Sequence, residues 1–294
     1  MPFELNHQTV RLSPMSKNFE YVLTHSPCSD GFASAFIAWL HHPNSKFVGL
    51  DPRNGFPDEL MEQLHGKSVI MMDIAFPRET ILKLSAITTK LQILDHHKTN
   101  MDALSDLPFA TFDMSRSGCG LAWQYYFPGE PMPDFLRYIE LRDLWLHKDN
   151  PDALYFTSAF PNTETFEAYN QYYTNPALVA ETIAKGRVQH EYIQQVTAQL
   201  ASTAVDCVWQ GVPMKVVNIG YPFASDVGDY LSQRHPECAI ALWTKQFGQP
   251  YNYSLRSNNP KGPNVGKLAQ WANGGGHNFS AGFKADLNPE QLFK

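Results

Sequence analysis

Three consecutive side chains with metal-binding chemistry follow an apolar run in this sequence. Asp95, His96 and His97 come directly after residues 91–94, which read Leu-Gln-Ile-Leu. Such a run is typical of a buried strand, and in open α/β sheets ligands bind at the carboxyl ends of the strands. A carboxylate and neutral imidazoles are good ligands for Mn²⁺, Fe²⁺, Co²⁺ or Zn²⁺. The triplet therefore predicts a metal or phosphate site, and a cap on the next helix is the alternative interpretation.

Two further predicted strands end in the same way. The run 69–72 is followed by Asp73, and the run 21–24 is followed by His25 and shortly afterwards by Asp30. Each aspartate taken alone could cap a helix or form a turn. Because parallel strands end at the same edge of a sheet, we expect these acids and imidazoles to lie close together. This convergence favours a metal site over three separate caps.

The segments that must position these residues alternate between strands and helices from residue 19 onward. The alternation predicts an α/β fold whose N-terminal domain has a parallel sheet with helices on both faces. A long, mostly polar helical pattern predicts a linker helix, and the strands and helices after it predict a smaller C-terminal domain of mixed α/β type. The predicted boundaries are 19–175 for the first domain, 176–203 for the linker helix and 204–294 for the second domain, with 1–18 as a loosely held extension.

Composition limits the partners of the protein. The 294 residues are 43% hydrophobic and 18% charged, as in an ordinary soluble protein. The net charge of −6 provides no bulk attraction to nucleic acid or to an anionic membrane. A polyanionic substrate must therefore be held locally, which favours a short one.

The cysteines indicate the compartment. Cys28, Cys119, Cys207 and Cys238 are scattered and form no CxxC pair, so a disulfide framework or a zinc ribbon is not expected. We expect reduced thiols and a cytoplasmic protein. The N-terminus does not resemble a signal peptide.

The order of the candidate residues resembles the DHH phosphoesterase superfamily. The matching residues are, in order, His25, Cys28, Asp30-Gly31, Asp73, Asp95-His96-His97 and Asp143. In the second half, Gly274-Gly275-Gly276-His277 is similar to the GGGH signature of the DHH-associated C-terminal domain. The resemblance covers essentially the whole chain and implies an enzyme similar to oligoribonucleases that act on nanoRNA.

The resemblance also implies roles for individual residues, around a dinuclear metal site between the two domains. The implied metal ligands are His25, Asp30, Asp73, His96 and Asp143, with Asp73 bridging. The implied catalytic residues are His97, as a phosphate contact or proton donor, and Asp95. The implied substrate-binding residues are Arg256, Gly274, Gly275, Gly276 and His277. Two Mn²⁺ ions per chain are expected, with Mg²⁺, Co²⁺ or Zn²⁺ as alternatives. Without the resemblance, Asp143 reads as an ion-pair partner of Arg142.

Cys28 is the position where the chain departs from the commoner pattern. Many family members have Asp-x-Asp-Gly where this chain has Cys28-Ser29-Asp30-Gly31. A thiolate ligand would favour a softer metal such as Zn²⁺. The alternative is a buried spectator thiol with water completing the coordination, and this is the interpretation that we prefer.

The expected function is metal-dependent hydrolysis of phosphodiester bonds in short oligonucleotides, nanoRNA or dinucleotides, to mononucleotides. The alternatives are a phosphodiesterase or phosphatase for cyclic dinucleotides or 3′-phosphoadenosine 5′-phosphate, and a catalytically impaired nucleotide-binding protein. The expected partner is a short single-stranded oligonucleotide or a small phosphorylated nucleotide. No membrane partner is expected, and a homodimer is one expectation for the assembly.

The aromatic residues are expected to serve mainly as core. The six tryptophans are Trp39, Trp123, Trp145, Trp209, Trp243 and Trp271. The segment 151–175 is rich in Asn, Thr, Tyr and Phe, and its sequence gives no clear secondary structure. Its aromatic side chains could stack on nucleobases, but core packing is the preferred interpretation.

Overall fold

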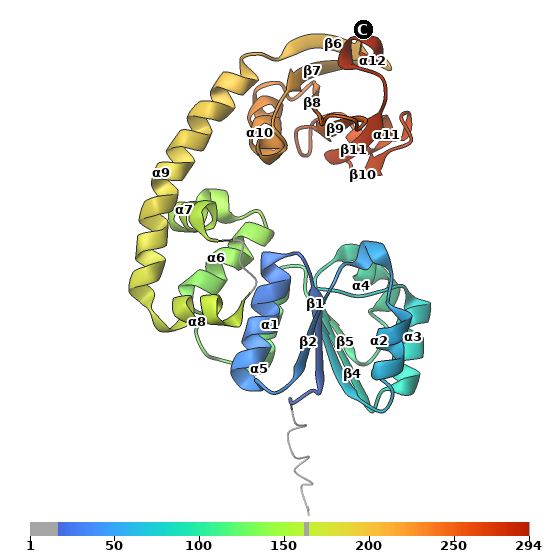
Figure 1. The fold of residues 1–294 in the computed structure, drawn as a ribbon, viewed down its shortest axis with the longest axis vertical. Helices are drawn as coiled ribbons and strands as arrows, with labels where there is room; N and C mark the ends of the chain where they lie inside the picture. The colour runs from blue at the N-terminus through green and yellow to red at the C-terminus, as the bar shows by residue number, and fades with distance from the viewer. Residues whose placement is uncertain (1–16, 162–164, 294) are drawn as a thin grey trace, which may run out of the picture. The chain divides into compact units, whose positions relative to one another are not determined.

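The computed structural model describes residues 17–161 and 165–293, which divide into two compact units, the first ending at Arg187 and the second beginning at Val188 (Figure 1). The predicted extension 1–18 lies outside the described residues except for its last two. Helix α9 (Pro176–Ala201) contains the division between the units. The predicted domain boundaries and the linker role of 176–203 stay predictions.

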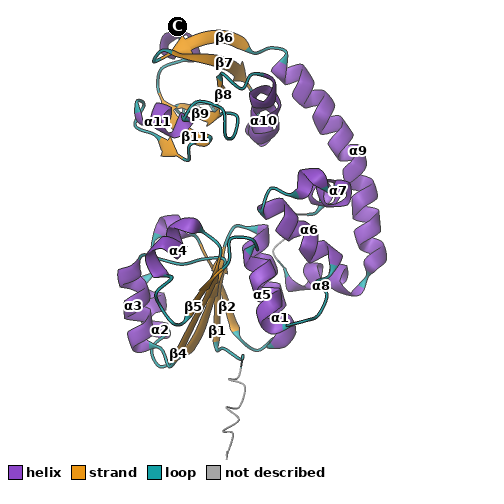
Figure 2. Cartoon of the chain, turned by 180° about the vertical axis from the view of Figure 1, so that it is seen from behind, coloured by secondary structure: helices purple, strands orange, loops and turns teal. Residues whose placement is uncertain are grey.

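The first unit is built on a five-stranded sheet of parallel strands in the order β2-β1-β3-β4-β5. Figure 2 shows this sheet with helices on both sides of it. The strands are β1 (Tyr21–His25), β2 (Lys46–Leu50), β3 (Ser68–Met72), β4 (Lys90–Asp95) and β5 (Ala110–Phe112). In their register Thr24 lies beside Met72, and Met72 lies beside Leu94. The next residues of these three strands therefore emerge together at one edge of the sheet.

Apolar side chains alternate between the two faces of this sheet, and helices cover both faces. Val22, Ile70 and Leu94 belong to one buried cluster, whereas Leu23, Met71 and Ile93 belong to another. The first cluster packs against α1 (Ser29–His41), α5 (Gly118–Tyr126), α6 (Asp134–Asp143), α7 (Pro151–Ala159) and α8 (Phe166–Thr174), and the second against α2 (Asp58–Gln63), α3 (Arg78–Ile87) and α4 (Lys98–Leu104). Burial on both faces explains the continuous apolar runs. The predicted α/β class with a parallel N-terminal sheet is confirmed.

The segment that could not be assigned from the sequence forms the helices α7 and α8. Asn150 caps α7 by accepting from the backbone N–H of Ala153, and Thr165 caps α8 in the same way. Phe156, Tyr169 and Tyr172 are buried in the first cluster. Core packing was therefore the right interpretation for these three aromatic residues.

The second unit contains a six-stranded mixed sheet in the order β10-β11-β9-β8-β7-β6, in which only the β7–β8 pair is parallel among the described strands. The strands are β6 (Val205–Trp209), β7 (Val212–Asn218), β8 (Ala239–Lys245), β9 (Tyr251–Arg256), β10 (Gly275–Gly276) and β11 (Ser280–Ala285). Helices α10 (Ala224–Arg234) and α11 (Val265–Gln270) pack in two different buried clusters, and α12 (Pro289–Leu292) lies near the C-terminus. The predicted mixed α/β second half is confirmed.

Two tryptophans contradict the expectation that all six fill cores. Trp123 and Trp209 are buried, but Trp145 is 61% exposed and Trp271 is 70% exposed. Trp145 lies two residues after the end of α6, and Trp271 directly follows α11. Apolar residues at such positions leave the buried face of the helix, which composition alone does not reveal.

His42 follows α1 as a buried imidazole that is fully hydrogen-bonded in its neutral form. Its Nδ1 lies 2.6 Å from Ser45 Oγ, and its Nε2 lies 2.9 Å from the Tyr126 hydroxyl. Because Ser45 Oγ donates to the Phe19 carbonyl, it accepts from Nδ1–H, and Nε2 accepts from Tyr126. Burial, with a smaller effect of His41, lowers the pKa of His42 to about 4.

We expect the free energy of unfolding to fall as the pH is lowered from about 6.5 towards 4. The pKa of His42 is lower in the folded chain than in the unfolded chain, so the unfolded chain binds more protons in this window. The loss is on the order of 3 kcal/mol at most, since one pKa unit corresponds to about 1.4 kcal/mol. His42→Gln should flatten this part of the profile in urea unfolding, and His65→Gln, at an exposed position, is the control. An unchanged slope in His42→Gln would refute the assignment.

Candidate metal centre

The structure brings all five predicted metal ligands together at the carboxyl edge of the parallel sheet. His25 ends β1, Asp73 follows β3 and His96 follows β4, while Asp30 lies in the first turn of α1 and Asp143 ends α6. They form overlapping groups in which the ligand atoms of each group lie within 4.8 Å of one another. The groups are Asp30, His96 and Asp143; His25, Cys28 and Asp73; and Asp73, Asp95, His96 and His97.

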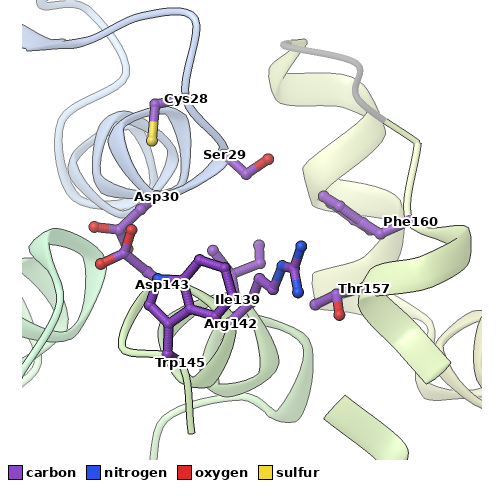
Figure 3. A pocket seen from close by; sticks show the side chains of 9 residues that line it. All are labelled: Cys28, Ser29, Asp30, Ile139, Arg142, Asp143, Trp145, Thr157 and Phe160. Atoms are coloured by element: carbon purple, nitrogen blue, oxygen red, sulfur yellow. The ribbon is translucent and has the colours of Figure 1, made fainter. Parts of the chain in front are cut away.

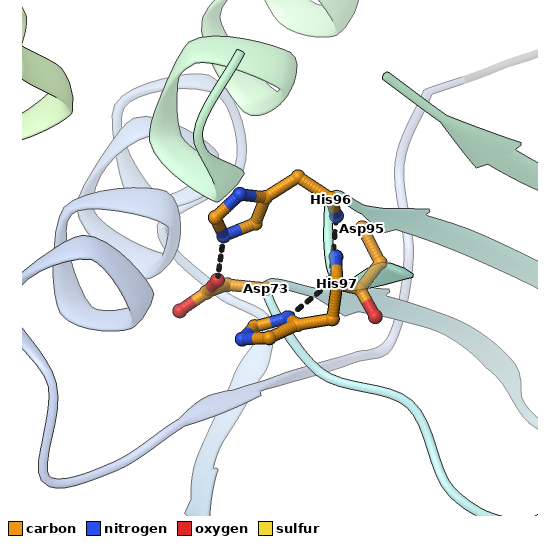
Figure 4. Close-up of side chains that lie close together, drawn as sticks. All are labelled: Asp73, Asp95, His96 and His97. Carbon is orange, nitrogen blue, oxygen red and sulfur yellow. Dashed lines mark hydrogen bonds and ion pairs between the residues drawn. The ribbon is translucent and has the colours of Figure 1, made fainter. Parts of the chain in front are cut away.

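Asp73 lies between the two sets of ligands. Its Oδ1 is 3.1 Å from His96 Nε2 (Figure 4), and its Oδ2 is 3.5 Å from His25 Nδ1. His96 Nε2 is in turn 3.4 Å from Asp143 Oδ2. The backbone of Asp73 is left-handed, with φ of 60°, a conformation that Asp and Asn adopt more readily than most residues. Asp73 thus has the position that a ligand shared by two cations needs.

Asp30 is held at the site by the N-terminus of α5. Its carboxylate accepts hydrogen bonds from Ser117 Oγ at 2.6 Å, Gly118 N at 2.7 Å and Cys119 N at 3.1 Å. Gly118 permits this approach, because a Cβ there would lie 2.4 Å from Asp73 Cβ and 2.8 Å from Asp30 Oδ2. The contact between Ser117 and Asp30 could not be predicted, since nothing in the sequence pairs α5 with α1.

The candidate ligands shift one another's pKa values, and the crowding of their carboxylates favours a bound cation. Burial, followed by the charges of Asp73 and Asp143, raises the pKa of Asp30 well above its usual range. Burial also raises the pKa of Asp143. Burial opposes ionisation of Asp73 as well, but the neighbouring imidazoles of His25 and His96 lower its pKa overall. Burial opposes protonation of His96, yet Asp73 and Asp143 raise its pKa to about 9.

Two buried oxygens test whether these residues suit metal ions. Asp73 Oδ2 and Asp143 Oδ2 are buried and have no hydrogen-bond partner among the described residues. A buried acceptor without a partner is unfavourable, and a cation would satisfy both oxygens. The donors are carboxylate and imidazole, which suit divalent Mn²⁺, Fe²⁺, Co²⁺ or Zn²⁺. The residues present therefore fit a metal centre.

Asp95 orients His97 through a hydrogen bond to its ring. The carboxylate of Asp95 is fully buried, and its Oδ1 lies 2.7 Å from His97 Nδ1. Asn100 Nδ2 donates to Asp95 Oδ2 at 2.6 Å. The hydrogen bond to Asp95 is the main cause that raises the pKa of His97. His97 Nδ1 is thus fixed, which leaves Nε2 as the ring atom that can face a substrate.

The Cys28 thiol lies close enough to the site to be a ligand. Its Sγ belongs to the group with His25 and Asp73. Burial, followed by the charge of Asp73, raises the pKa of Cys28 to about 12. Without a cation the sulfur is therefore a protonated thiol at neutral pH.

We expect Cys28→Ser to leave the manganese content and the turnover nearly unchanged, because His25, Asp73 and solvent can complete the site. The measurement is elemental analysis beside a rate assay, with Cys207→Ser as the control at a cysteine of the second unit. Cobalt-loaded protein gives a second readout. A thiolate-to-cobalt charge-transfer band that disappears in Cys28→Ser would show that Cys28 is a ligand and would overturn this expectation.

The sequence neighbours Arg142 and Asp143 contact different partners. Arg142 Nη1 donates to His147 Nε2 at 2.6 Å, whereas Asp143 Oδ2 lies near His96. Among the described residues no ion pair joins Arg142 to Asp143. The alternative interpretation of Asp143 as the ion-pair partner of Arg142 is therefore wrong.

The predicted substrate-binding residues lie in the second unit. Arg256 ends β9 and pairs with Ser280 of β11, and the Arg256 side chain packs over Gly228 of α10. Gly275 and Gly276 form β10, which pairs with Gly282 and Ala281 of β11. His277 N donates to the Ser280 carbonyl at 2.7 Å, and Gly274 N donates to the Ala269 carbonyl at 2.9 Å. The structure thus puts the GGGH turn and the strand of Arg256 on either side of β11, and their binding of substrate stays a prediction.

The first unit is an α/β fold with a parallel sheet that carries acids and imidazoles at one edge. The fold of the chain is similar to that of the pGpG-specific phosphodiesterase from Vibrio cholerae, with a TM-score of 0.53, 11% identity and coverage of 90% of this chain and 92% of that chain. It is also similar to a solved DHH domain from a member of a family of ribosomal proteins, with a TM-score of 0.50, 13% identity and coverage of 92% and 84%. The chain therefore has the fold of the DHH superfamily, as the motif order predicted.

Sequence comparison finds a viral relative but no family profile. An uncharacterized protein of Acanthamoeba polyphaga mimivirus is 29% identical in an alignment of length 303. The alignment covers 93% of this chain and 71% of the relative. No protein-family model matches the chain. Within the part of the chain that the structure describes, no helix is both long and apolar enough to cross a membrane.

Proposed function

We propose that this protein is a metal-dependent phosphodiesterase that hydrolyses short oligonucleotides, such as dinucleotides, to mononucleotides. The observation that carries the proposal is the convergence of Asp30, Asp73, Asp143, His25 and His96 at one sheet edge, where two buried carboxylate oxygens accept no hydrogen bond from the described residues. The fold shared with a pGpG-specific phosphodiesterase supports the choice of a dinucleotide-sized substrate.

The proposed roles follow from the contacts of each residue. His25 and Asp73 would hold one cation, and Asp30, Asp73, His96 and Asp143 would hold the other. Two divalent cations there, manganese in this proposal, would polarise a phosphoryl oxygen and supply hydroxide from water at neutral pH. The fold holds these oxygen and nitrogen donors in place. Most of them lie at the edge of the parallel sheet, and the N-terminus of α5 holds Asp30.

His97 is the proposed proton donor to the departing oxygen. Its Nδ1 is held by Asp95, so the imidazole has a fixed orientation and Nε2 is the atom that can give a proton. Its raised pKa keeps it protonated to a higher pH than an ordinary histidine. In this proposal Asp95 is a positioning residue.

The proposed substrate is short because the site is acidic and the chain is acidic as a whole. A net charge of −6 offers no long basic track for a polynucleotide. In the proposal Arg256, His277 and the backbone of Gly274–Gly276 bind a terminal phosphate, since Arg gives bidentate contacts and glycine lets N–H groups approach closely. Localisation in the cytoplasm and assembly as a homodimer belong to the same proposal.

A turnover screen tests the proposal. Purified protein with Mn²⁺ is assayed on dinucleotides, cyclic dinucleotides, 3′-phosphoadenosine 5′-phosphate and pyrophosphate, before and after treatment with a chelator. We expect dinucleotides to be cleaved fastest, the chelator to abolish turnover and added Mn²⁺ to restore it. Full turnover in chelator without added metal would refute the mechanism, and faster cleavage of another substrate would replace the dinucleotide. Metal content separates an enzyme from an impaired binder, because two ions per chain are expected of the enzyme.

A further inference from the structure

A cavity of about 400 Å³ adjoins the candidate metal centre within the first unit (Figure 3). Asp30 and Asp143 form part of its wall, so the cavity and the acidic cluster are continuous. Cys28 and Ser29 at the start of α1 also line it. The rest of the wall comes from α6, α7 and the residues just after them, with Arg142, Trp145, Thr157 and Phe160. Its volume lies within the range that small-molecule sites occupy, about 300–1,000 Å³.

Trp145 is exposed in a backbone conformation that disfavours it. The side chain is 61% exposed, and its φ of 60° lies in the left-handed region. A bulky residue there is strained, and such strain is concentrated at functional sites. The hydrophobic core does not explain Trp145, because the ring lies on the cavity wall.

Phe160 supplies a second aromatic ring to the wall. It stacks on Phe156 with a centroid distance of 4.9 Å, and Phe156 is fully buried. Phe160 is therefore anchored on the core on one side and exposed to the cavity on the other. Two aromatic rings beside the candidate metal centre suit a ligand with a flat, aromatic group better than a sugar phosphate alone.

Arg142 places a positive charge in the cavity in a fixed orientation. Its guanidinium is held by His147, which is almost completely buried, and lies 5.5 Å from the centroid of the Trp145 ring. Figure 3 shows it directed toward Thr157 and Phe160. Its N–H groups suit the acceptor atoms that every nucleobase carries on its edge.

We propose that this cavity is a nucleobase subsite, in which Trp145 and Phe160 contact the faces of the base and Arg142 donates to its edge. The inference rests on the proposed function, because it assigns the cavity to the nucleotide whose phosphate would lie beside the cation held by Asp30 and Asp143. It adds to that function a preference for substrates that carry a base over sugar phosphates of the same charge. The subsite belongs entirely to the first unit.

The test compares AMP with ribose 5-phosphate, which differ only in the base, by calorimetric titration in the presence of Mn²⁺. Stacking on an aromatic side chain contributes roughly a tenfold to hundredfold gain in affinity, so the wild type should bind AMP that much more tightly. Trp145→Gly should remove most of this preference and leave the affinity for ribose 5-phosphate unchanged. The glycine suits a φ of 60°, so the variant should fold at least as stably as the wild type.

Two further variants complete the design. Leu146→Ala changes the next exposed residue, which does not line the cavity, and it should keep the preference for AMP. Trp145→Phe retains an aromatic ring and should keep part of the preference for AMP. Equal binding of AMP and ribose 5-phosphate by the wild type, or a full preference in Trp145→Gly, would overturn the subsite. Neither result depends on hydrolysis, so a chain that binds AMP but cleaves no phosphodiester would refute the proposed function and leave the subsite standing.

Discussion

Asp73→Asn should lower kcat/KM on the preferred phosphodiester by about a thousandfold or more while the protein stays folded. Removal of one preorganised charge from an active site typically reduces the rate by about 10²–10³, and Asp73 contacts the residues of both predicted cation sites. Asparagine has nearly the same shape and tolerates the left-handed backbone at this position. The loss should therefore reflect the missing charge and not a collapsed sheet edge.

The measurement pairs steady-state kinetics with metal content and circular dichroism. Asp102→Asn is the matched control, because Asp102 lies on the nearby helix α4 and forms an exposed pair with Lys98. The control should keep its two ions and its rate. If Asp73→Asn kept both ions and its rate fell by less than about tenfold, Asp73 would not be a shared ligand.

Asp143→Asn should change stability and activity in opposite directions. Burial raises the pKa of Asp143, so the folded metal-free chain disfavours the charged form that exists at neutral pH. The neutral amide removes this penalty, and the metal-free variant should melt roughly 2–4 °C higher, as expected for about 1 kcal/mol. Turnover with Mn²⁺ should fall by about a hundredfold, because a ligand is lost.

Melting curves with and without Mn²⁺ test this prediction. A ligand that binds only the folded state stabilises it in proportion to its affinity, so Mn²⁺ should raise the melting temperature of the wild type more than that of the variant. Asp134→Asn, on the exposed surface of the same helix, should behave like the wild type. A variant that melts lower than the wild type in chelator, or that gains as much from Mn²⁺, would contradict the assignment of Asp143.

The fold and the gathering of the candidate ligands could be predicted because both depend on strand periodicity. The apolar runs before His25, Asp73 and His96 identified three parallel strands, and parallel register alone brings their ends together. Asp143 came from the motif order of the DHH family, since nothing in α6 itself indicates which way its last turn faces.

Other features depend on contacts between segments that are distant in sequence. Ser117 donates to Asp30 across 87 positions, and no local pattern encodes that pairing. The helices α7 and α8 were missed because their aromatic residues are spaced among Asn, Thr and Tyr, and their caps Asn150 and Thr165 are seen only in the structure. Trp145 was misjudged because its exposure follows from where α6 stops, which a hydrophobic residue type does not show.

Gly118 has no functional group, yet its position makes it as restrictive as a ligand. Any side chain there would overlap Asp73 and Asp30 at once, and it would push apart the helix and the strand end that hold the acidic cluster. In a saturation library selected for activity, substitutions at this glycine should be depleted as completely as those at His96. A genetic map of inactive alleles would therefore include a residue that contacts neither the substrate nor the metal ions. Evolutionary change at this position is limited by the space available and not by the chemistry of the reaction.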